Sequence, residues 1–490
     1  MCQQSNNFFY IPIIVLLSIS GYSQNKKISA NIQSAISKFT DENYLKTSSI
    51  GISIIDMRNG QLVGQFNSNK SLIPASSQKI LSSAAILDVL GKDFRYQTNF
   101  YLSGRFLEDS SFYGRLLIKP SGDPSFCSPY QSGAMLYKDL TDSLSTLFLN
   151  LGIRSFKGEV IVDESLVTDI PENPEWLWYD LGNYYGAGSF NLNFLENSIS
   201  VDIKQGLKPG ATCEIVKVEP DFLKPYFISR VVSSAENIKE ELFVLGTTQE
   251  VNRTVHGHIK CCGNDTHTIR ASLPNPSATF IRVLKNEWMN HNIQMLDTVV
   301  SDSSNFSSIL FQYQSVPLEK LCDRALKKSV NMYCESFLHS FGLKMVGNTN
   351  RKKSIEALEK YWEKQGLEPN GFKLEDGSGL SPKNSLSSKH LATALYLIVK
   401  KIKLKNFHTL LVDPNSQGVL AGYMLKHPNT VGRLQLKSGG MEGVLSYSGY
   451  IMFQGQEQFA ISLIINHYDG NLVVIRKKIA QFFSELCEIK

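Results

Sequence analysis

Residues 73–85 read IPASSQKILSSAA and place Ser76 three positions before Lys79, where an apolar helical pattern begins. Side chains at i and i+3 of a helix lie on one face, one turn apart. A serine hydroxyl needs an adjacent base to act as a nucleophile, and a lysine amine can be that base when desolvation lowers its pKa. Free backbone N–H groups at a helix start can also stabilise an oxyanion. The alternative is that Ser76 is an ordinary helix N-cap. Motifs elsewhere in the sequence are needed to choose between the two roles.

Two distant strings supply residues of the kind that a serine nucleophile requires. KKSVNMYCE places Ser329 and Asn331 between two predicted helices. LQLKSGGMEG places Lys437 on a predicted strand, where Gly439 permits close approach of a substrate backbone. The ordered triple Ser-x-x-Lys, Ser-x-Asn and Lys-Thr/Ser-Gly is the signature of β-lactamases and penicillin-binding proteins. The three motifs together favour catalysis over capping.

The pattern of strands and helices predicts an α/β (α+β) fold. Strands at 48–69 and three more near the end of the chain predict an antiparallel sheet, flanked by helices at 76–90, 317–342 and 471–490. We expect a discontinuous domain at 24–95 and 312–490, split by a β-rich module at 96–311. The module is expected to hold two subdomains, about 96–200 with 272–311 and about 201–271.

The first residues are expected to direct export. An apolar run from Phe8 to about Ile19 is short for a membrane span but suits a signal-peptide core, although no Lys or Arg precedes it. We expect a signal peptide at 1–23 and a periplasmic mature protein. Retention as an uncleaved anchor is the alternative.

Composition excludes some classes of partner. The 490 residues are 42% hydrophobic and carry a net charge of +5 with no basic run, so no nucleic-acid partner is expected. Eight cysteines are too few for a disulfide-stapled scaffold of this length. HGHIKCCGNDTH (256–267) offers His and Cys ligands, but adjacent cysteines on a strand point to opposite faces. No metal and no cofactor are therefore expected.

The chain resembles the serine peptidase S13 family, the low-molecular-mass penicillin-binding proteins that act as D-alanyl-D-alanine carboxypeptidases and endopeptidases. The 250 positions from Lys79 to Ser329 exceed what a single-domain β-lactamase has room for, and this family carries a large insertion there. PASSQK is similar to P-A-S-T-x-K, SGDPSF to G-G-D-P-T-L, and LEDGSGLSPKN to x-D-G-S-G-L-S-R-x-N. The resemblance covers nearly the whole mature chain and implies a β-lactamase/transpeptidase-like domain.

The resemblance also implies a mechanism. Ser76 would attack the carbonyl of the penultimate D-Ala with Lys79 as general base, Ser329 would relay the proton to the leaving amine, and Asn331 would orient Lys79 and the substrate. Peptidoglycan stem peptides are the expected substrates, and β-lactam antibiotics are expected to acylate Ser76. The sequence leaves peripheral membrane contact and the oligomeric state open.

Further residues are assigned to substrate binding through the same resemblance. Lys437 and Ser438 are expected to hold the terminal carboxylate, and Gly439 lies beside them on the strand. The Gly440 N–H is expected to complete the oxyanion hole with that of Ser76. Asp180, with Tyr185 beside it, is expected to recognise the amine end of the diamino acid.

Two departures from the family pattern affect the expected carboxylate site. Gly440 stands where the family has Thr, and Pro382 where it has Arg, so the balance between carboxypeptidase and endopeptidase is left open. Two other functions remain as alternatives: a β-lactamase or esterase on the same core, and a catalytically inactive wall-binding protein.

Overall fold

The computed structural model describes residues 12–235, 240–247, 250–300, 308–414 and 428–489. The chain forms two compact units. The first unit comprises Met1–Ser77, Asn370–Phe372 and Ser385–Lys490, and the second comprises Gln78–Pro369 and Lys373–Asn384. The domain boundaries expected from the sequence at 95 and 312 stay a prediction.

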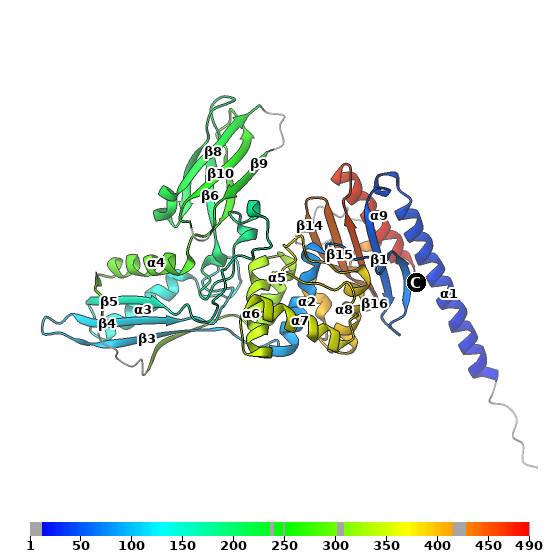
Figure 1. Ribbon diagram of the computed structural model, residues 1–490, viewed down its shortest axis with the longest axis horizontal. Coiled ribbons are helices and arrows are strands. Elements are labelled where there is room, and N and C mark those ends of the chain that lie inside the picture. The colour runs from blue at the N-terminus through cyan, green and yellow to red at the C-terminus, as the bar shows by residue number, and fades with distance from the viewer. Residues whose placement is uncertain (1–11, 236–239, 248–249, 301–307, 415–427, 490) are drawn as a thin grey trace, which may run out of the picture. The chain divides into compact units, whose positions relative to one another are not determined.

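A five-stranded antiparallel sheet of order β14-β15-β16-β1-β2 forms the first unit (Figure 1). Its strands are β1 (Ser49–Asp56), β2 (Leu62–Phe66), β14 (Leu434–Met441), β15 (Val444–Phe453) and β16 (Gln456–Asn466). β1 is rich in Ile and almost fully buried, as expected for a strand covered on both faces. The start and the end of the chain thus meet in one sheet, with Ile52 opposite Leu463.

Helices cover both faces of this sheet. On one face, α1 (Pro12–Thr40) and α9 (Leu472–Glu488) share a hydrophobic core with the strands. On the other face, α8 (Ser388–Lys400) is held by a hydrogen bond of 2.9 Å from the Tyr450 hydroxyl to the Leu395 carbonyl. Short 3₁₀ turns complete the unit at Asn43–Leu45, Ala75–Gln78, Phe407–Leu410 and Pro428–Thr430.

In the second unit, α2 (Lys79–Leu90) packs against α5 (Leu318–Lys327), α6 (Asn331–Val346) and α7 (Arg351–Gln365). Residues 79–87 of α2 are all buried, including Lys79 and two serines. The helix predicted to begin at Ser76 therefore begins at Lys79, preceded by the 3₁₀ turn that contains Ser76. Ser76 is consequently not the N-cap of α2, a position that Gln78 occupies without a side-chain cap.

Three sheets make up the β-rich part of the second unit. The first, of order β12-β5-β4-β3-β13, consists of Gln294–Asp297, Ser155–Val162, Phe112–Lys119, Gln97–Phe106 and Ile309–Gln314. The second, β11-β6-β7, consists of Thr266–Ser272, Ser198–Lys204 and Glu214–Glu219. The third, β8-β10-β9, consists of Phe227–Ser234, Arg253–Lys260 and Glu241–Leu245. Short 3₁₀ segments connect them at Trp178–Asp180, Tyr184–Gly186, Leu195–Asn197 and Asp221–Tyr226.

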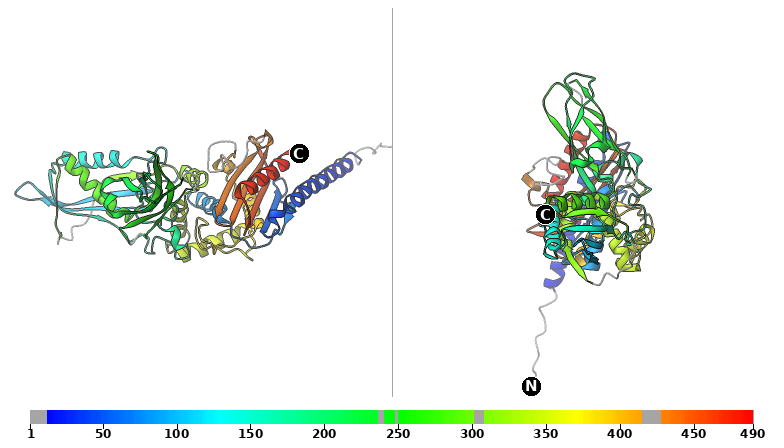
Figure 2. Two further views of the ribbon diagram at one scale, coloured as in Figure 1. Left: turned by 90° about the horizontal axis from the view of Figure 1, so that it is seen from above. Right: turned by 90° about the vertical axis from the view of Figure 1, so that its left-hand side faces the viewer.

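Two helices that the sequence did not reveal lie side by side over the first of these sheets, α3 (Tyr137–Asn150) and α4 (Pro276–Asn290) (Figures 1 and 2). The Trp288 ring of α4 lies 4.6 Å from the ring of Phe148 on α3 and 5.7 Å from that of Phe156 on β5. These aromatic contacts anchor the helical layer on the sheet. The expected α/β fold with an antiparallel sheet, flanking helices and additional β sheets is confirmed.

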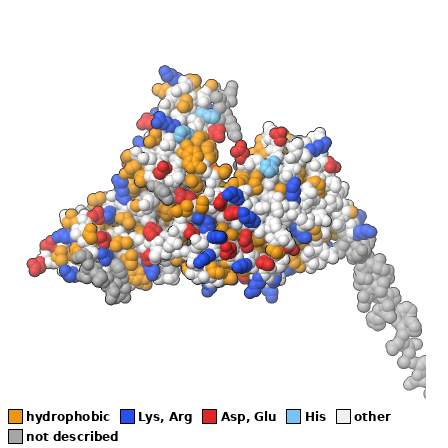
Figure 3. All heavy atoms as spheres, viewed as in Figure 1, with side chains coloured by type: hydrophobic (Ala, Val, Ile, Leu, Met, Phe, Trp, Pro, Cys, Tyr) orange, Lys and Arg blue, Asp and Glu red, His pale blue; other side chains and the backbone are white. Residues whose placement is uncertain are grey.

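Three sequence expectations concern the ends and the surface. Residues 1–11 of the expected signal peptide lie outside the described residues, so its cleavage stays a prediction. In the described part of the chain, no helix has both the length and the apolar character needed to cross a membrane. On the face shown in Figure 3, Lys and Arg side chains lie among Asp and Glu rather than in one continuous field.

The aromatic contacts of Trp288 give a first prediction. Trp288→Ala should lower the free energy of unfolding by about 3–5 kcal/mol, because a fully buried indole is replaced by a cavity. Urea unfolding followed by circular dichroism measures the loss. The control is Met289→Ala on the same helix, where the side chain is 60% exposed, with an expected change within about 0.5 kcal/mol. Equal unfolding midpoints for the two variants would contradict the assigned packing.

Candidate active site

Ser76 lies in the first unit, in the tight 3₁₀ turn Ala75–Gln78. Ala75 has a φ of 46°, a left-handed conformation that costs energy for a residue with a Cβ. Ser76 is half-buried between the buried residues Ala75 and Ser77. The Ser77 hydroxyl lies 2.7 Å from that of Ser446 on β15, which ties the turn to the sheet. Of the two adjacent serines, Ser77 is therefore structural and Ser76 is accessible.

Strand β14 runs beside this turn. A Cβ built at Gly439 would lie 2.7 Å from the Ser76 nitrogen and 2.9 Å from the Ser77 nitrogen, so only glycine permits this approach. Lys437 is 1% exposed, and its Nζ donates to the Ser438 carbonyl at 2.6 Å. Ser438 is half-buried and Gly440 is exposed. The first unit thus brings the predicted nucleophile beside the Lys-Ser-Gly strand.

Lys79 lies in the second unit and is fully buried. Its Nζ donates hydrogen bonds to Asn331 Oδ1 at 2.6 Å and to the Ser378 carbonyl at 2.7 Å. Burial lowers the pKa of the Lys79 ammonium, because the charged form loses more hydration than these acceptors replace. The nearby Cys334 and Asp376 oppose that shift. A lysine whose pKa is lowered in this way can be neutral and accept a proton.

The Ser-x-Asn motif forms the turn between α5 and α6. Ser329 has a φ of 57°, again in the left-handed region, and is half-buried. Asn331 begins α6, and its Nδ2 donates to the Tyr185 carbonyl at 2.8 Å while its Oδ1 accepts from Lys79. Both ends of the amide are thus fixed, which sets the direction of the Lys79 amine.

Asp180 and Tyr185 lie in the loop that the Asn331 amide reaches. The two side chains form a hydrogen bond with each other, and burial is the main cause of the raised pKa of the Asp180 carboxyl. Burial and the neighbouring Asp180 also raise the pKa of Tyr185. A chain of hydrogen bonds within the second unit therefore runs from Lys79 through Asn331 and Tyr185 to Asp180. The predicted chemical roles of these residues stay predictions.

One carboxylate, Asp376, organises the loop that holds Lys79, and it lies in the stretch LEDGSGLSPKN that resembles the family pattern. Asp376 Oδ2 accepts from the Trp176 indole nitrogen at 2.9 Å, and its Oδ1 accepts from Asn384 Nδ2 at 2.9 Å and from the Gly379 nitrogen at 2.7 Å. Gln78 Nε2 donates to the Asp376 carbonyl at 2.6 Å. These bonds place the Ser378 carbonyl, two residues later, against Lys79.

Glu335 supports the same loop from α6. It is 2% exposed and accepts from the Gly377 nitrogen at 3.1 Å. Burial, with Asp376 nearby, raises the pKa of Glu335 to about 7. Trp176 and Gln78 were missed at the sequence level. Trp176 lies four positions before Asp180, and Gln78 lies between Ser76 and Lys79.

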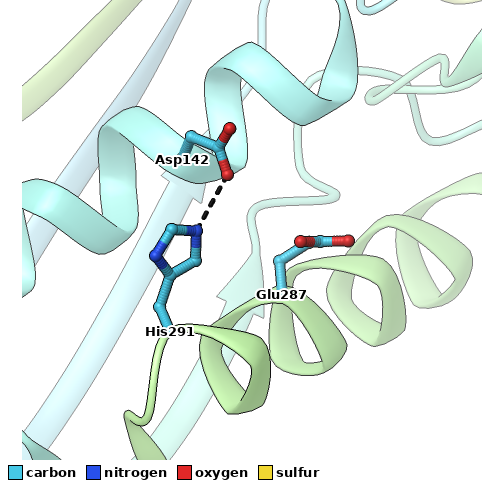
Figure 4. Close-up of side chains that lie close together, drawn as sticks. All are labelled: Asp142, Glu287 and His291. Carbon is cyan, nitrogen blue, oxygen red and sulfur yellow. Dashed lines mark hydrogen bonds and ion pairs between the residues drawn. The ribbon is translucent and has the colours of Figure 1, made fainter.

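The residues that invited a metal interpretation do not form a common site. Cys261 and Cys262 are joined in a disulfide, so neither offers a thiolate. Among the described residues, the group with metal-ligating geometry is Asp142, Glu287 and His291, on α3 and at the end of α4. Figure 4 shows the hydrogen bond of 2.9 Å between His291 Nε2 and Asp142 Oδ1, with Glu287 beside it. This pair links the two helices, so the arrangement has a structural explanation.

Comparison with solved structures supports the fold. The crystal structure of penicillin binding protein 4 from Haemophilus influenzae matches with a TM-score of 0.77 at 20% identity, covering 92% of this chain and 99% of that one. The same protein in complex with a β-lactam matches with a TM-score of 0.70 at 20% identity, covering 93% and 99%.

Sequence comparison identifies the family. The D-alanyl-D-alanine carboxypeptidase DacB of Haemophilus influenzae is 22% identical over 430 residues, 86% of each protein. The D-alanyl-D-alanine carboxypeptidase of an Actinomadura species is 22% identical over 438 residues, 86% of this chain and 78% of that protein. The model of the D-Ala-D-Ala carboxypeptidase 3 (S13) family matches residues 32–486. The resemblance seen in the motifs is thereby confirmed, and the chain belongs to the D-Ala-D-Ala carboxypeptidase 3 (S13) family.

Proposed function

We propose that this protein is a serine DD-peptidase that hydrolyses D-Ala-D-Ala termini, D-Ala–diamino acid cross-links of peptidoglycan, or both, through an acyl-enzyme on Ser76. The observation that carries the proposal is the buried Lys79, held by Asn331 and the Ser378 carbonyl, three residues after an accessible serine. A lysine whose pKa is lowered by burial suits a general base better than a solvated surface charge does. The family to which the chain belongs supports the substrate class.

Acylation begins when Ser76 Oγ attacks the carbonyl carbon of the penultimate D-Ala. Neutral Lys79 takes the hydroxyl proton as the Oγ–C bond forms. When the peptide bond breaks, the Lys79 ammonium returns this proton through the Ser329 hydroxyl to the leaving amine. Backbone N–H groups of Ser76 and Gly440 stabilise the oxyanion. Water then hydrolyses the ester and releases the shortened peptide. A β-lactam acylates Ser76 by the same attack, but its leaving group stays attached.

Substrate binding is divided between the two ends of the scissile bond. Lys437 and Ser438 hold the terminal carboxylate, and Asp180 with Tyr185 binds the free amine end of the diamino acid. The position of Asp180 supports this role, because its carboxyl is hydrogen-bonded to Tyr185, whose carbonyl holds Asn331. We also propose that the protein acts in the periplasm, where its polymeric substrate lies.

The nucleophile gives the most direct prediction. Ser76→Ala should reduce covalent labelling by fluorescent penicillin and D-Ala release by about 10³-fold or more, because no other oxygen replaces the attacking atom. The matched control is Ser77→Ala, which should keep the label, since Ser77 contacts Ser446 and not the substrate. Mass spectrometry of the labelled protein measures the covalent label, and mass spectrometry of digested muropeptides measures D-Ala release. Failure of the label to attach to either wild type or Ser76→Ala would favour the inactive wall-binding alternative. Rapid penicillin turnover without peptide cleavage would favour a β-lactamase.

The state of Lys79 gives a prediction in pH. The rate of penicillin acylation should rise with pH as Lys79 loses its proton, with a midpoint below the ordinary lysine value of 10.5. Asn331→Asp should move this midpoint to higher pH, because a carboxylate at the position of Oδ1 stabilises the ammonium. Asn331→Leu should move it to lower pH, because it removes an acceptor. Stopped-flow acylation from pH 5 to about 10 measures the midpoints. Shifts in the same direction for both variants would exclude Lys79 as the base.

Gly440 gives a prediction about substrate preference. A Cβ built there lies 3.8 Å from the Val444 carbonyl and 4.0 Å from Leu445 Cδ2, so a larger side chain fits. Gly440→Thr should lower KM for a D-Ala-D-Ala peptide by about tenfold, because the added hydroxyl can donate to the terminal carboxylate. Gly440→Val has the same shape without the hydroxyl and should show no gain. Equal KM values for the two variants would contradict a carboxylate at this position.

A further inference from the structure

A cavity of about 610 Å³ lies in the second unit, and its lining contains none of the residues of the proposed mechanism. One wall is helix α7, and the others are the loop at 169–175 and residues 373–375. Its volume lies within the range of about 300–1,000 Å³ that small-molecule sites occupy. The size alone suits a small organic ligand.

The cavity combines apolar side chains with a negatively charged wall. Ile170, Pro174, Ile355 and Leu374 supply the apolar part. Carboxylates outnumber cations along the lining by five to three. A ligand that matches this lining has a short aliphatic part and a positive charge.

Internal contacts already occupy most of the charged groups. Asp169 accepts from the Arg351 nitrogen at 2.5 Å and from Asn350 Nδ2 at 2.9 Å, and Lys373 pairs with Glu375 at 2.5 Å. The Arg351 guanidinium donates to the Ile170 carbonyl at 2.8 Å. These groups hold the walls in place, so they are not the first to meet a ligand.

Glu175 pairs with Lys383, which leaves three charged lining residues, Lys352, Glu356 and Glu359, all on α7. The two carboxylates are the groups that a cation would meet. They lie three positions apart on α7, on one side of the helix, and neither forms an ion pair within the described part of the chain. Glu359 accepts from the Leu374 nitrogen at 2.8 Å through one oxygen. Burial is the main cause of the raised pKa of Glu359, and the like charges of Glu375 and Glu356 add to it, so a cation beside this carboxyl would stabilise its ionised form.

We propose that this cavity binds a primary alkylammonium group, with the ammonium between Glu356 and Glu359 and the aliphatic part against Ile355 and Leu374. Two sources share this chemistry. One is a free aliphatic diamine, and the other is the side-chain amine of the diamino acid in a peptidoglycan peptide. The binding site stands independently of the proposed DD-peptidase activity. Only the peptide source connects the two.

The experiment is titration calorimetry with n-pentylammonium on the full-length Ser76→Ala protein, so that the result does not depend on catalysis. n-Pentanol, which has the same stem without the charge, is the ligand control. We expect saturable binding of the amine that is about tenfold or more tighter than that of the alcohol. Absence of saturable amine binding, or equal binding of the alcohol, would overturn the proposal.

Variants then locate the site. Glu356→Gln combined with Glu359→Gln should weaken amine binding by about tenfold or more, while the amide introduced at position 359 keeps an oxygen that can accept from the Leu374 nitrogen. The matched control is Glu363→Gln, an exposed residue of α7 outside the cavity lining, which should bind as before. Equal loss in both proteins, or no loss in either, would overturn the assignment. Titrations with 1,5-diaminopentane and with a purified tripeptide muropeptide show which source binds more tightly.

Discussion

Burial of the Lys79 amine is the constraint on which the rest of the proposed site depends. An ammonium in an apolar interior costs several kcal/mol unless charges or dipoles replace its water. Here the replacement includes an amide oxygen and a backbone carbonyl, contributed by Asn331 and Ser378. Such neutral dipoles stabilise an ammonium less than a carboxylate at the same positions would, so the lysine is held in place while burial still lowers its pKa. A base for a serine hydroxyl requires this balance.

Much of the surrounding structure serves to position those two oxygens. The Asn331 amide is fixed at its other end by the Tyr185 carbonyl, 146 positions away. Asp376 gathers donors from Trp176 and Gly379 and so defines the path of the backbone to Ser378, which lies 299 positions from Lys79. This separation explains why a large insertion can be accommodated between the motifs, since the geometry around Lys79 depends on the segments that touch it and not on the length of chain between them.

The first unit imposes a different constraint on Ser76. The tight turn at Ala75 and the absence of a side chain at Gly439 bring the backbone of β14 against the Ser76 nitrogen. A Cβ at Gly439 would separate the Ser76 backbone from the strand, whereas Gly440 has space around it. The tolerance for side chains thus changes from one glycine to the next, because the first faces the turn and the second does not.

The sequence by itself determined the α/β class and the order of the three motifs, because those depend on residue type, periodicity and spacing, which are local properties. The family followed from the resemblance of those motifs to a known pattern. The sequence also indicated the candidate residues Ser76, Lys79, Ser329, Asn331 and Lys437. The roles of Trp176, Gln78 and the Ser378 carbonyl could not be predicted, since a hydrogen bond between distant segments leaves no local pattern and every residue has a carbonyl. The packing of α3 against α4 and the cavity beside α7 were likewise decided only by tertiary structure. Each of these depends on which distant segments fold together, and not on the residues of any one segment.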